Sequence, residues 1–417
     1  MLHGICRKTF AVEPLQTPPW RKLELDLAPL DVAAGLRSQG GLVFLDTGGG
    51  GENAQSFVTA APVRTLTGHI DKDWEQVRQV LREHRGNAGG LFGFVGYDGH
   101  YSLGLHPQVM VFHHETRRWH ECGTLSHLLP ATAPPLPSPP VLDFQPRMTR
   151  AAFIIAVERA KAYIAAGDIY QVNLAHSWRA LWPADADALA LYARLREVSP
   201  APYGAFLETD GAQILCASME SFLRMTGRDI TTRPIKGTRP RFPENREKDA
   251  ESARELITSP KERAELLMIT DLLRNDLGMA CEFGSIHTPD LARVESFAQV
   301  FHLVSTVRGT LREDMDHASA LRACFPGGSI TGAPKKRARE IIAELEPAPR
   351  GIYTGALGYF GFSGESEFNI VIRTAVRRGD EITLHAGAGI VADSVPALEH
   401  EETLHKAAGL LRAATGS

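Results

Sequence analysis

Short turn sequences recur in the second half of this 417-residue chain, and each lies between two runs rich in β-forming residues. Tight turns of this kind join neighbouring antiparallel strands, because only a few residues are needed to reverse the chain between them. The sequence therefore predicts antiparallel sheet rather than a series of parallel βαβ units. The turns are TDG at 209–211, TGRD at 226–229, SGE at 363–365 and RGD at 378–380.

Helical segments interrupt the predicted strands. Thr149 is a candidate N-cap and Gly167 a stop for a helix of about four or five turns. A second helical block covers 244–258, and the next helix starts at 259–262 with a capping box and proline at its first position. The fold class is therefore predicted to be α+β with largely antiparallel sheet.

The strand sequence IYQVNLAHSW alternates between apolar and polar residues. Tyr170, Val172 and Leu174 are expected on a packed face, with Gln171 on the opposite, polar face.

A proline-rich run, PATAPPLPSPP at 130–140, divides the chain. Its prolines neither continue a helix nor donate hydrogen bonds to a sheet, so it is predicted to be a linker. The predicted division is an amino-terminal region at 1–129, a linker at 130–147 and a larger domain at 148–417.

The charge balance argues against a nucleic-acid or membrane partner. Lys and Arg number 45 against 49 Asp and Glu, a formal charge of −4, so no excess of positive charge favours anionic polymers or lipids. The most apolar stretches, at 153–157 and 266–269, fall far short of the ~20 residues that a membrane helix needs. The amino terminus lacks the features of a secretory signal, so a cytoplasmic protein is expected.

The cysteines occur singly and never in a CxxC pair, which favours reduced packing residues over disulfides or zinc ligands. They are Cys6, Cys122, Cys216, Cys281 and Cys324.

Arg373 is unusual in NIVIRTAV, where alternation places it on one face of an apolar strand beside Val371 and Ala375. A buried guanidinium needs a carboxylate partner or water. Taken alone, the favoured interpretation is an arginine paired with a protein carboxylate or placed at the sheet rim, and a bound ligand carboxylate is the alternative.

Glu399, Glu402 and Lys406 lie along one face of a predicted helix. Two carboxylates there would hold a hard divalent cation if a third oxygen donor converged, although such a stripe is often only a solvated face. Glu265 is a further candidate, because the capping role on its helix is assigned to Glu262.

Two more segments contain candidate site residues, one for binding an anion and one for nucleophilic attack. The glycine loop FPGGSITGAPKKRAREII leads into a helix, with Ser329 or Thr331 near the cap and Pro334 near the first position, where free amides bind anions. Lys236, in TTRPIKGTRP, would act as a nucleophile only in an environment that favours the neutral amine, and taken alone it would be a surface residue.

Together these segments resemble the chorismate-utilising enzymes over about 149–414, and more weakly through GGLFGFVGYD. The motifs that carry the resemblance are PIKGTRPR, ERAELLMITDLLRNDLG, VFHLVSTVRG, FPGGSITGAPKKRA, GIYTGALGYF, FNIVIRT, HAGAGIVADS and EHEETLHKA. The resemblance implies two antiparallel sheets packed as a sandwich, with helices outside.

Two positions separate the branches of that family. Isochorismate and salicylate synthases carry a water-activating lysine where this chain has Gln171, so the resemblance implies the ammonia-using branch. Within it, anthranilate synthases typically read PIAGT and aminodeoxychorismate synthases PIKGT, so Lys236 points to the aminodeoxychorismate synthases. Anthranilate synthase component I and a non-catalytic chorismate-binding relative are the alternatives.

The resemblance also implies roles for residues. Glu265 and Glu402, with Glu399 nearby, match ligands of Mg²⁺, and Lys406, Gly237 and Thr238 match positions near the ring carboxylate of chorismate. Tyr353, Arg373 and Gly389 match positions that hold the enolpyruvyl carboxylate, and Gln171 and Ser329 are further substrate-binding candidates. Glu220 and His302 match the acid and the histidine near the C4 hydroxyl.

The implied reaction forms a covalent Lys236 adduct before ammonia enters at C4. The chain shows no glutaminase segment, so the resemblance also implies a separate glutamine amidotransferase subunit as the ammonia source.

Overall fold

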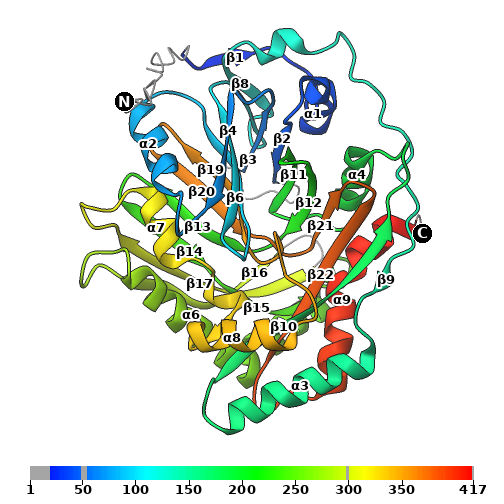
Figure 1. Cartoon of the computed structure of the whole chain (residues 1–417), viewed down its shortest axis with the longest axis vertical. Coiled ribbons are helices and arrows are strands. Elements are labelled where there is room, and N and C mark those ends of the chain that lie inside the picture. The colour runs from blue at the N-terminus through cyan, green and yellow to red at the C-terminus, as the bar shows by residue number, and fades with distance from the viewer. Residues whose placement is uncertain (1–18, 48–53, 297–299, 416–417) are drawn as a thin grey trace, which may run out of the picture.

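The computed structural model describes residues 19–47, 54–296 and 300–415, in which two large antiparallel sheets face each other. We call them sheet one and sheet two (Figure 1). In spatial order, sheet one contains β1 (Arg21–Leu23), β8 (Arg118–Cys122), β7 (Val109–His113), β3 (Gln55–Thr59), β2 (Val43–Asp46), β11 (Tyr203–Thr209), β12 (Ala212–Ser218), β21 (Thr374–Arg378), β22 (Glu381–Ile390), β10 (Gln171–Leu181) and β18 (Gly332–Ala333), with β9 (Gln145–Pro146) beside β10.

Sheet two lies across the interface from sheet one. Its order is β15 (Ile235–Pro240), β17 (Val300–Thr310), β14 (Asp229–Arg233), β13 (Ser221–Thr226), β20 (Glu365–Ile370), β19 (Ala356–Gly361), β5 (Gly90–Val95), β6 (His100–His106) and β4 (Arg64–His69), with β16 (His287–Ser296) beside β17.

Helices cover the outer faces of both sheets, which confirms the predicted sandwich. The helices are α1 (Pro29–Leu36), α2 (Glu75–Glu83), α3 (Arg150–Ala165), α4 (Ala188–Val198), α5 (Arg246–Thr258), α6 (Pro260–Gly278), α7 (His317–Cys324), α8 (Lys335–Leu345) and α9 (Pro396–Thr415), with short 3₁₀ turns η1 (Arg37–Gln39), η2 (Leu125–Leu128) and η3 (Gly328–Ile330).

The core between the sheets consists of apolar side chains from both. Phe92, Phe94 and Leu357 of sheet two pack against Leu207 and Ile214 of sheet one, and all five are buried. On the outer faces, α1, α4 and α9 cover sheet one, whereas α2 and α7 cover sheet two. Burial of these apolar faces is the main force that holds the layers together.

The four predicted turns each connect adjacent strands. They join β11 to β12, β13 to β14, β19 to β20 and β21 to β22. In the first, Asp210 has φ +50° and Gly211 has φ +66°, the left-handed conformation that tight hairpin turns require. The antiparallel prediction is therefore confirmed.

The predicted helix starts are also observed, with one exception in detail. The side chain of Thr149 accepts a hydrogen bond from Ala152 N at the start of α3, and that of Ser259 accepts one from Glu262 N at the start of α6. The second half of the capping box is wrong, because Ser259 N donates to Leu256 O instead. This leaves the Glu262 carboxylate available for other contacts.

The proline-rich segment runs without helix or strand from 130 to 144. Strands on both sides of it share sheets, since β2 pairs with β11 and β5 pairs with β19. A division into domains at this segment stays a prediction.

Four cysteines are free and buried, as expected: Cys122, Cys216, Cys281 and Cys324. Cys6 and the amino-terminal segment lie outside the described residues.

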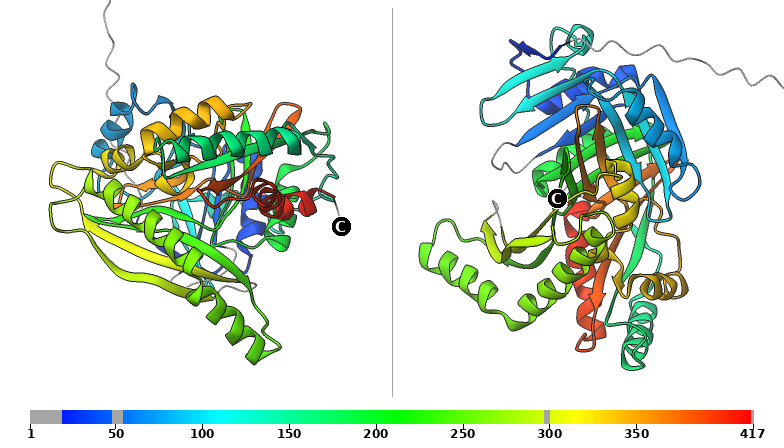
Figure 2. Two further views of the ribbon diagram at one scale, coloured as in Figure 1. Left: turned by 90° about the horizontal axis from the view of Figure 1, so that it is seen from below. Right: turned by 90° about the vertical axis from the view of Figure 1, so that its left-hand side faces the viewer.

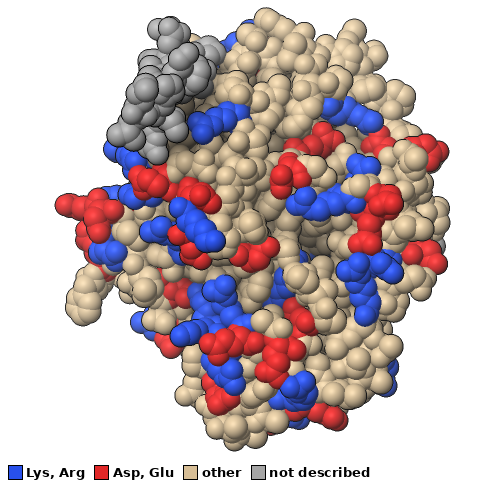
Figure 3. All heavy atoms as spheres, in the orientation of Figure 1, with Lys and Arg blue, Asp and Glu red and all other residues tan. Residues whose placement is uncertain are grey.

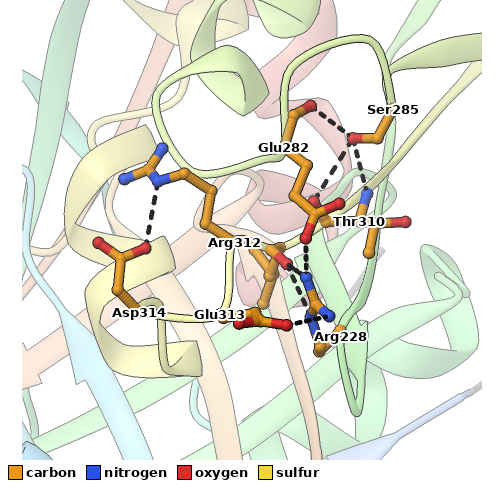
Figure 4. Close-up of polar contacts among 8 residues, drawn as sticks. Arg228, Glu282, Ser285, Thr310, Arg312, Glu313 and Asp314 are labelled. Atoms are coloured by element: carbon orange, nitrogen blue, oxygen red, sulfur yellow. Dashed lines mark hydrogen bonds and ion pairs between the residues drawn. The ribbon is translucent and has the colours of Figure 1, made fainter.

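Helices α5 and α6 form a lobe with β16 and β17 that stands out from the body beside α9 (Figure 2). Its far end is tied to the β13–β14 hairpin by Arg228, whose guanidinium donates twice to Leu311 O, at 2.9 and 2.8 Å. Figure 4 shows Glu282 and Glu313 converging on the same guanidinium. The three side chains are about half exposed or more, so the ion pairs add at most about 1 kcal/mol to the stability of the fold.

Among the described residues, no helix has the length and apolar character to cross a membrane.

One prediction concerns the close contact of β19 with its neighbours. Gly358 lies opposite Gly93, and a Cβ on Gly358 would lie 1.9 Å from Glu367 O. We expect Gly358→Ala to lower the free energy of unfolding by about 3 kcal/mol, measured in urea, because a backbone atom cannot give way. Gly278→Ala is the control: its Cβ would meet only Ile286 Cδ1 at 3.9 Å, so its stability should hold or rise. Equal effects of the two substitutions would contradict this packing argument.

Candidate functional site

Lys236 lies on β15 beside a break in the pairing between β15 and β17. The next residue, Gly237, has φ +67°, and a Cβ there would lie 2.6 Å from Leu256 Cδ1, so only glycine fits. Lys236 Nζ lies 3.8 Å from Glu265 Oε2, and both side chains are about four-fifths buried. The lysine taken alone was interpreted as a surface residue. That interpretation is wrong.

Gly389 leaves space where Lys236 and Gln171 meet. A Cβ at Gly389 would lie 2.9 Å from Gln171 Nε2 and 3.7 Å from Lys236 Nζ. The Oε1 atom of Gln171 is buried and has no hydrogen-bond partner in the described part of the chain. A buried acceptor without a partner is costly, so a ligand or water at this point would stabilise it. Tyr170 was expected on the packed face of the strand, but it is 73% exposed, so that expectation is wrong. Gln171 is buried on the opposite face, close to Lys236.

Two pairs of glutamates face this region from different helices. Glu262 and Glu265 lie on α6, and Glu399 and Glu402 lie on α9, each pair three residues apart. Burial raises the pKa of Glu262, and the charge of Glu265 raises it further. Burial likewise raises the pKa of Glu399, with Glu402 adding to the effect. The four carboxylates face four cations, Lys236, Lys261, Lys406 and Arg239, and Arg239 Nη1 lies 3.8 Å from Glu262 Oε1.

Lysines neutralise part of this charge. Lys406 Nζ lies 2.6 Å from Glu402 Oε1 and donates to Gly387 O at 3.0 Å. Burial alone would raise the pKa of Glu402, but Lys406, Lys236 and Lys261 lower it below its ordinary value. Lys261 also lies 3.9 Å from Glu265 Oε1. We call these seven residues, Glu262, Glu265, Glu399, Glu402, Lys236, Lys261 and Lys406, the charge cluster.

Glu220 is a buried carboxyl group beside the charge cluster. Burial raises its pKa, and the effect is only partly opposed by a hydrogen bond with Ser329 and by the charges of Lys236 and Lys406. A raised pKa keeps a carboxylic acid protonated to higher pH, which is what a proton donor requires.

Ser329 lies in η3. The sequence predicted a side-chain cap from Ser329 or Thr331 on the following helix, but this is wrong, since Pro334 itself is the N-cap of α8.

His302 is held in one tautomer. Its Nδ1 lies 3.0 Å from Gly237 O, so this nitrogen carries the hydrogen, and it also lies 3.2 Å from Thr238 Oγ1. Burial lowers the pKa of His302, and the nearby charge of Arg373 lowers it further. The ring is therefore neutral near pH 7, with Nε2 as its acceptor.

Arg373 does not lie in a strand, which corrects the sequence prediction. It occupies the connection between β20 and β21 with φ +52°, a conformation that alternation cannot reveal. Burial lowers the pKa of Arg373, although the Tyr353 hydroxyl opposes the effect. No ion pair or hydrogen bond of its side chain exists within the described residues. The guanidinium is only partly buried, and without a protein partner it is suited to bind an anion.

Tyr353 is buried and stacks on His385, with ring centroids 5.1 Å apart. The far side of this stack belongs to a separate cavity of about 550 Å³ between β4–β6 and the β21–β22 hairpin. That cavity is lined by none of the charge-cluster residues. Figure 3 shows basic and acidic side chains interspersed on this face, without a continuous basic area over the residues described.

The structure thus brings the predicted residues into one connected region. Arg373 links Tyr353 to His302, His302 contacts Gly237 and Thr238, and Lys236 leads from there to the carboxylates. Sequence reasoning missed Glu262 because it was assigned to a cap. The signal was present, since Glu262 and Glu265 repeat the spacing of Glu399 and Glu402.

Two of the carboxylates are candidates for holding a magnesium ion. Mg²⁺ is usually held by one or two protein carboxylates, with water or substrate oxygens completing its octahedron. Glu265 and Glu402 approach Lys236 from two helices, and burial is the main cause of the raised pKa values of Glu262 and Glu399. In the described part of the chain, no group of three His, Cys, Asp or Glu residues is arranged to hold a metal ion, so the magnesium site stays a prediction.

A family model described as chorismate binding enzyme matches residues 72–412, well over half of the chain. The chain belongs to the chorismate binding enzyme family. The resemblance that the sequence motifs carry is therefore confirmed at the level of the family.

Relatives within this family have two different names. Aminodeoxychorismate synthase component 1 of Bacillus subtilis is 46% identical over 271 residues, 65% of this chain and 57% of the relative. Anthranilate synthase component 1 of Streptomyces coelicolor is 48% identical over 267 residues, 64% of this chain and 52% of the relative. The matched part of the chain thus spans little more than half the length of these relatives. Identity alone does not separate the two names.

Solved structures agree on the fold. Anthranilate synthase component I from Streptococcus pneumoniae superposes with a TM-score of 0.76 at 29% identity, covering 86% of this chain and 92% of that one. MenF, the menaquinone-specific isochorismate synthase from Escherichia coli, has a TM-score of 0.78 over 96% of this chain and 95% of its own. At 22% identity, MenF supports the fold alone.

A prediction follows from the unpaired Arg373. Arg373→Met should not lower the free energy of unfolding of the ligand-free protein, because it removes a partly buried charge that has no ion pair or hydrogen bond among the described residues. It should weaken chorismate binding by roughly 10- to 100-fold, the contribution of a charge-assisted hydrogen bond. Calorimetry measures binding, and urea unfolding measures stability. The control is Arg196→Met, which breaks a pair with buried Asp46 (2.7 Å) and should cost about 3 kcal/mol. A destabilised Arg373→Met protein with unchanged binding would contradict the assignment.

Proposed function

We propose that this chain is the chorismate-aminating component of an aminodeoxychorismate synthase. It would convert chorismate and ammonia to 4-amino-4-deoxychorismate, a precursor of 4-aminobenzoate and folate. The observation that carries the proposal is the position of Lys236 Nζ, 3.8 Å from Glu265 Oε2 and close to Gly389, where a Cβ would lie 3.7 Å from this amine. The anthranilate synthases in this family typically have alanine at that place.

The proposed first step uses two side chains. Glu220 in its protonated form donates a proton to the C4 hydroxyl, which leaves as water. The neutral amine of Lys236 attacks C2, so a C2–N bond forms while the C4–O bond breaks and the ring double bonds shift. The Lys236 ammonium must first lose a proton, and Glu265, 3.8 Å away, would accept it.

In the second step the ring double bonds return to their original positions. Ammonia forms a bond to C4, the C2–N bond breaks, and its electron pair returns to Lys236. The product keeps its enolpyruvyl side chain and carries an amino group at C4. His302, neutral with an acceptor at Nε2, is placed near the C4 hydroxyl by the family resemblance and would hold that group in position.

Chorismate is a dianion, so the site must supply positive charge at two places. Arg373, with Tyr353 and the backbone at Gly389, would hold the enolpyruvyl carboxylate. Lys406, Gly237 and Thr238 would lie near the ring carboxylate. When bound to Glu265 and Glu402, with Glu399 nearby, Mg²⁺ would neutralise charge on that carboxylate. We further propose a glutamine amidotransferase subunit as the source of ammonia, and a cytoplasmic location.

Product identification tests the proposal. The purified chain should consume chorismate with magnesium and ammonium salt, and give 4-amino-4-deoxychorismate without releasing pyruvate. Pyruvate together with fluorescent anthranilate would favour the anthranilate synthase alternative. Absence of any chorismate consumption would favour a non-catalytic binding relative. Full glutamine-dependent turnover by the isolated chain would contradict the separate amidotransferase.

The role of Lys236 gives a second prediction. Lys236→Ala should lower kcat by about 100-fold or more and change chorismate binding much less, because the nucleophile is lost. Lys236→Arg keeps the positive charge beside Glu265 but offers no amine nucleophile. Stopped assays on both variants separate the two effects. Recovery of activity in Lys236→Arg would mean that the charge, and not the amine, matters.

The metal assignment gives a third prediction. Glu402→Gln should raise the magnesium concentration needed for half-maximal activity by roughly 10-fold or more, because a hard anionic ligand becomes neutral. Glu401→Gln, one residue away on the same helix and outside the charge cluster, is the control and should behave as the parent protein. A magnesium titration of each variant, followed by chorismate consumption, provides the measurement. An unchanged requirement in Glu402→Gln would remove this residue from the metal site.

A further inference from the structure

One edge of β10 is only partly covered by strands. β10 pairs with β22 along its length, whereas the other edge pairs with β18 at 171–172 and with β9 at 178–179. The stretch between these pairings would leave backbone groups without strand partners. Such groups need other partners when they are buried.

Two side chains fill this gap. Glu346 Oε1 accepts a hydrogen bond from Ala175 N at 2.8 Å, and Arg350 Nη2 donates to Asn173 O at 2.7 Å. The two side chains thus provide an acceptor and a donor to the strand edge, as a neighbouring strand would. Glu346 lies just beyond the end of α8, and Arg350 lies four residues later.

The two side chains also bind each other in a buried fork. Arg350 Nε lies 2.9 Å from Glu346 Oε2 and Nη2 lies 2.6 Å from Oε1, with the side chains 1% and 7% exposed. Burial alone would lower the pKa of Arg350, but the charge of Glu346 raises it above the ordinary value. The guanidinium is therefore fixed in position as well as charged.

The remaining donors of Arg350 reach two further segments. Nη1 donates to Ile330 O at 2.9 Å and to Thr354 Oγ1 at 3.2 Å. Ile330 follows Ser329, and Thr354 follows Tyr353. One guanidinium therefore contacts β10, which begins at Gln171, and the neighbours of two other residues expected to contact chorismate.

We propose that Arg350, oriented by Glu346, is a positioning residue that sets the relative placement of Gln171, Ser329 and Tyr353 for chorismate binding. The inference rests on the proposed function for its substrate. Arg350 itself lies on the separate 550 Å³ cavity and not in the charge cluster, so it acts through the three segments that it joins. Only a planar group with several fixed donors makes these contacts together.

Arg350→Lys is the test. Lysine keeps the charge opposite Glu346 but cannot donate to Asn173, Ile330 and Thr354 at once. We expect the KM for chorismate to rise by about 10-fold or more, with a smaller fall in kcat, because contacts that bind the substrate are displaced. Glu346→Gln keeps an acceptor for Ala175 N and should give a smaller rise. If Arg350→Lys does not fold, the KM of Glu346→Gln is the test in its place.

Arg196→Lys is the matched control, because Arg196 also pairs with a buried carboxylate, Asp46, but on α4 and β2, away from the charge cluster. It should lower the melting temperature and leave the KM unchanged. An unchanged KM in a folded Arg350→Lys protein would overturn the proposal. So would an equal rise in KM in Arg196→Lys, since it would reflect general loosening.

Amide hydrogen exchange separates this inference from the proposed function. If the parent protein does not turn over chorismate, the proposed function fails, but the positioning contacts remain measurable. Exchange at Ala175 and around 329–331 should be faster in Arg350→Lys than in the parent, and unchanged in Arg196→Lys. Unchanged exchange in Arg350→Lys would overturn the positioning role whatever the activity.

Discussion

Lysines and glutamates from separate elements attract one another in the candidate site. This attraction determines how much charge the site holds. Glu262 and Glu265 come from α6, Glu399 and Glu402 from α9, and Lys236 from β15. Burial and like charge raise the pKa of two of these carboxyls, so the arrangement favours added positive charge. The two packed sheets and their helices hold these groups together, because exposed side chains alone would separate to reduce the repulsion.

Arg373 complements the charge cluster. It is a partly buried cation whose side chain has no ion pair or hydrogen bond among the described residues, whereas three of the four glutamates pair with Lys or Arg. A ligand with two carboxylates, one facing Arg373 and one facing a cation bound at the glutamates, would be held at both ends. The stability lost by burying unpaired charges is typical of sites preorganised for a charged ligand.

The sequence predicted those features that local patterns control. Tight turns at 209–211 and 378–380 and the N-cap at Thr149 depend on a few adjacent residues, and all are observed. The left-handed backbone of Arg373 was not predictable, because a strand-like pattern continues on both sides of it. The Arg350–Glu346 fork was missed because its partners on β10 lie far away in the chain, and only the folded sheet shows which edge lacks a strand. The expected residues Lys236, Glu265, Glu402 and Lys406 lie together in the charge cluster.

In the proposed reaction the Lys236 amine bonds covalently to chorismate. Mass spectrometry of the intact chain, incubated with chorismate and magnesium in the absence of ammonium, detects this bond. We expect a mass increase equal to chorismate less one water, located on the peptide that contains Lys236 and lost on adding ammonium. No increase, while chorismate is consumed once ammonium is present, would contradict it, as would an adduct on another residue.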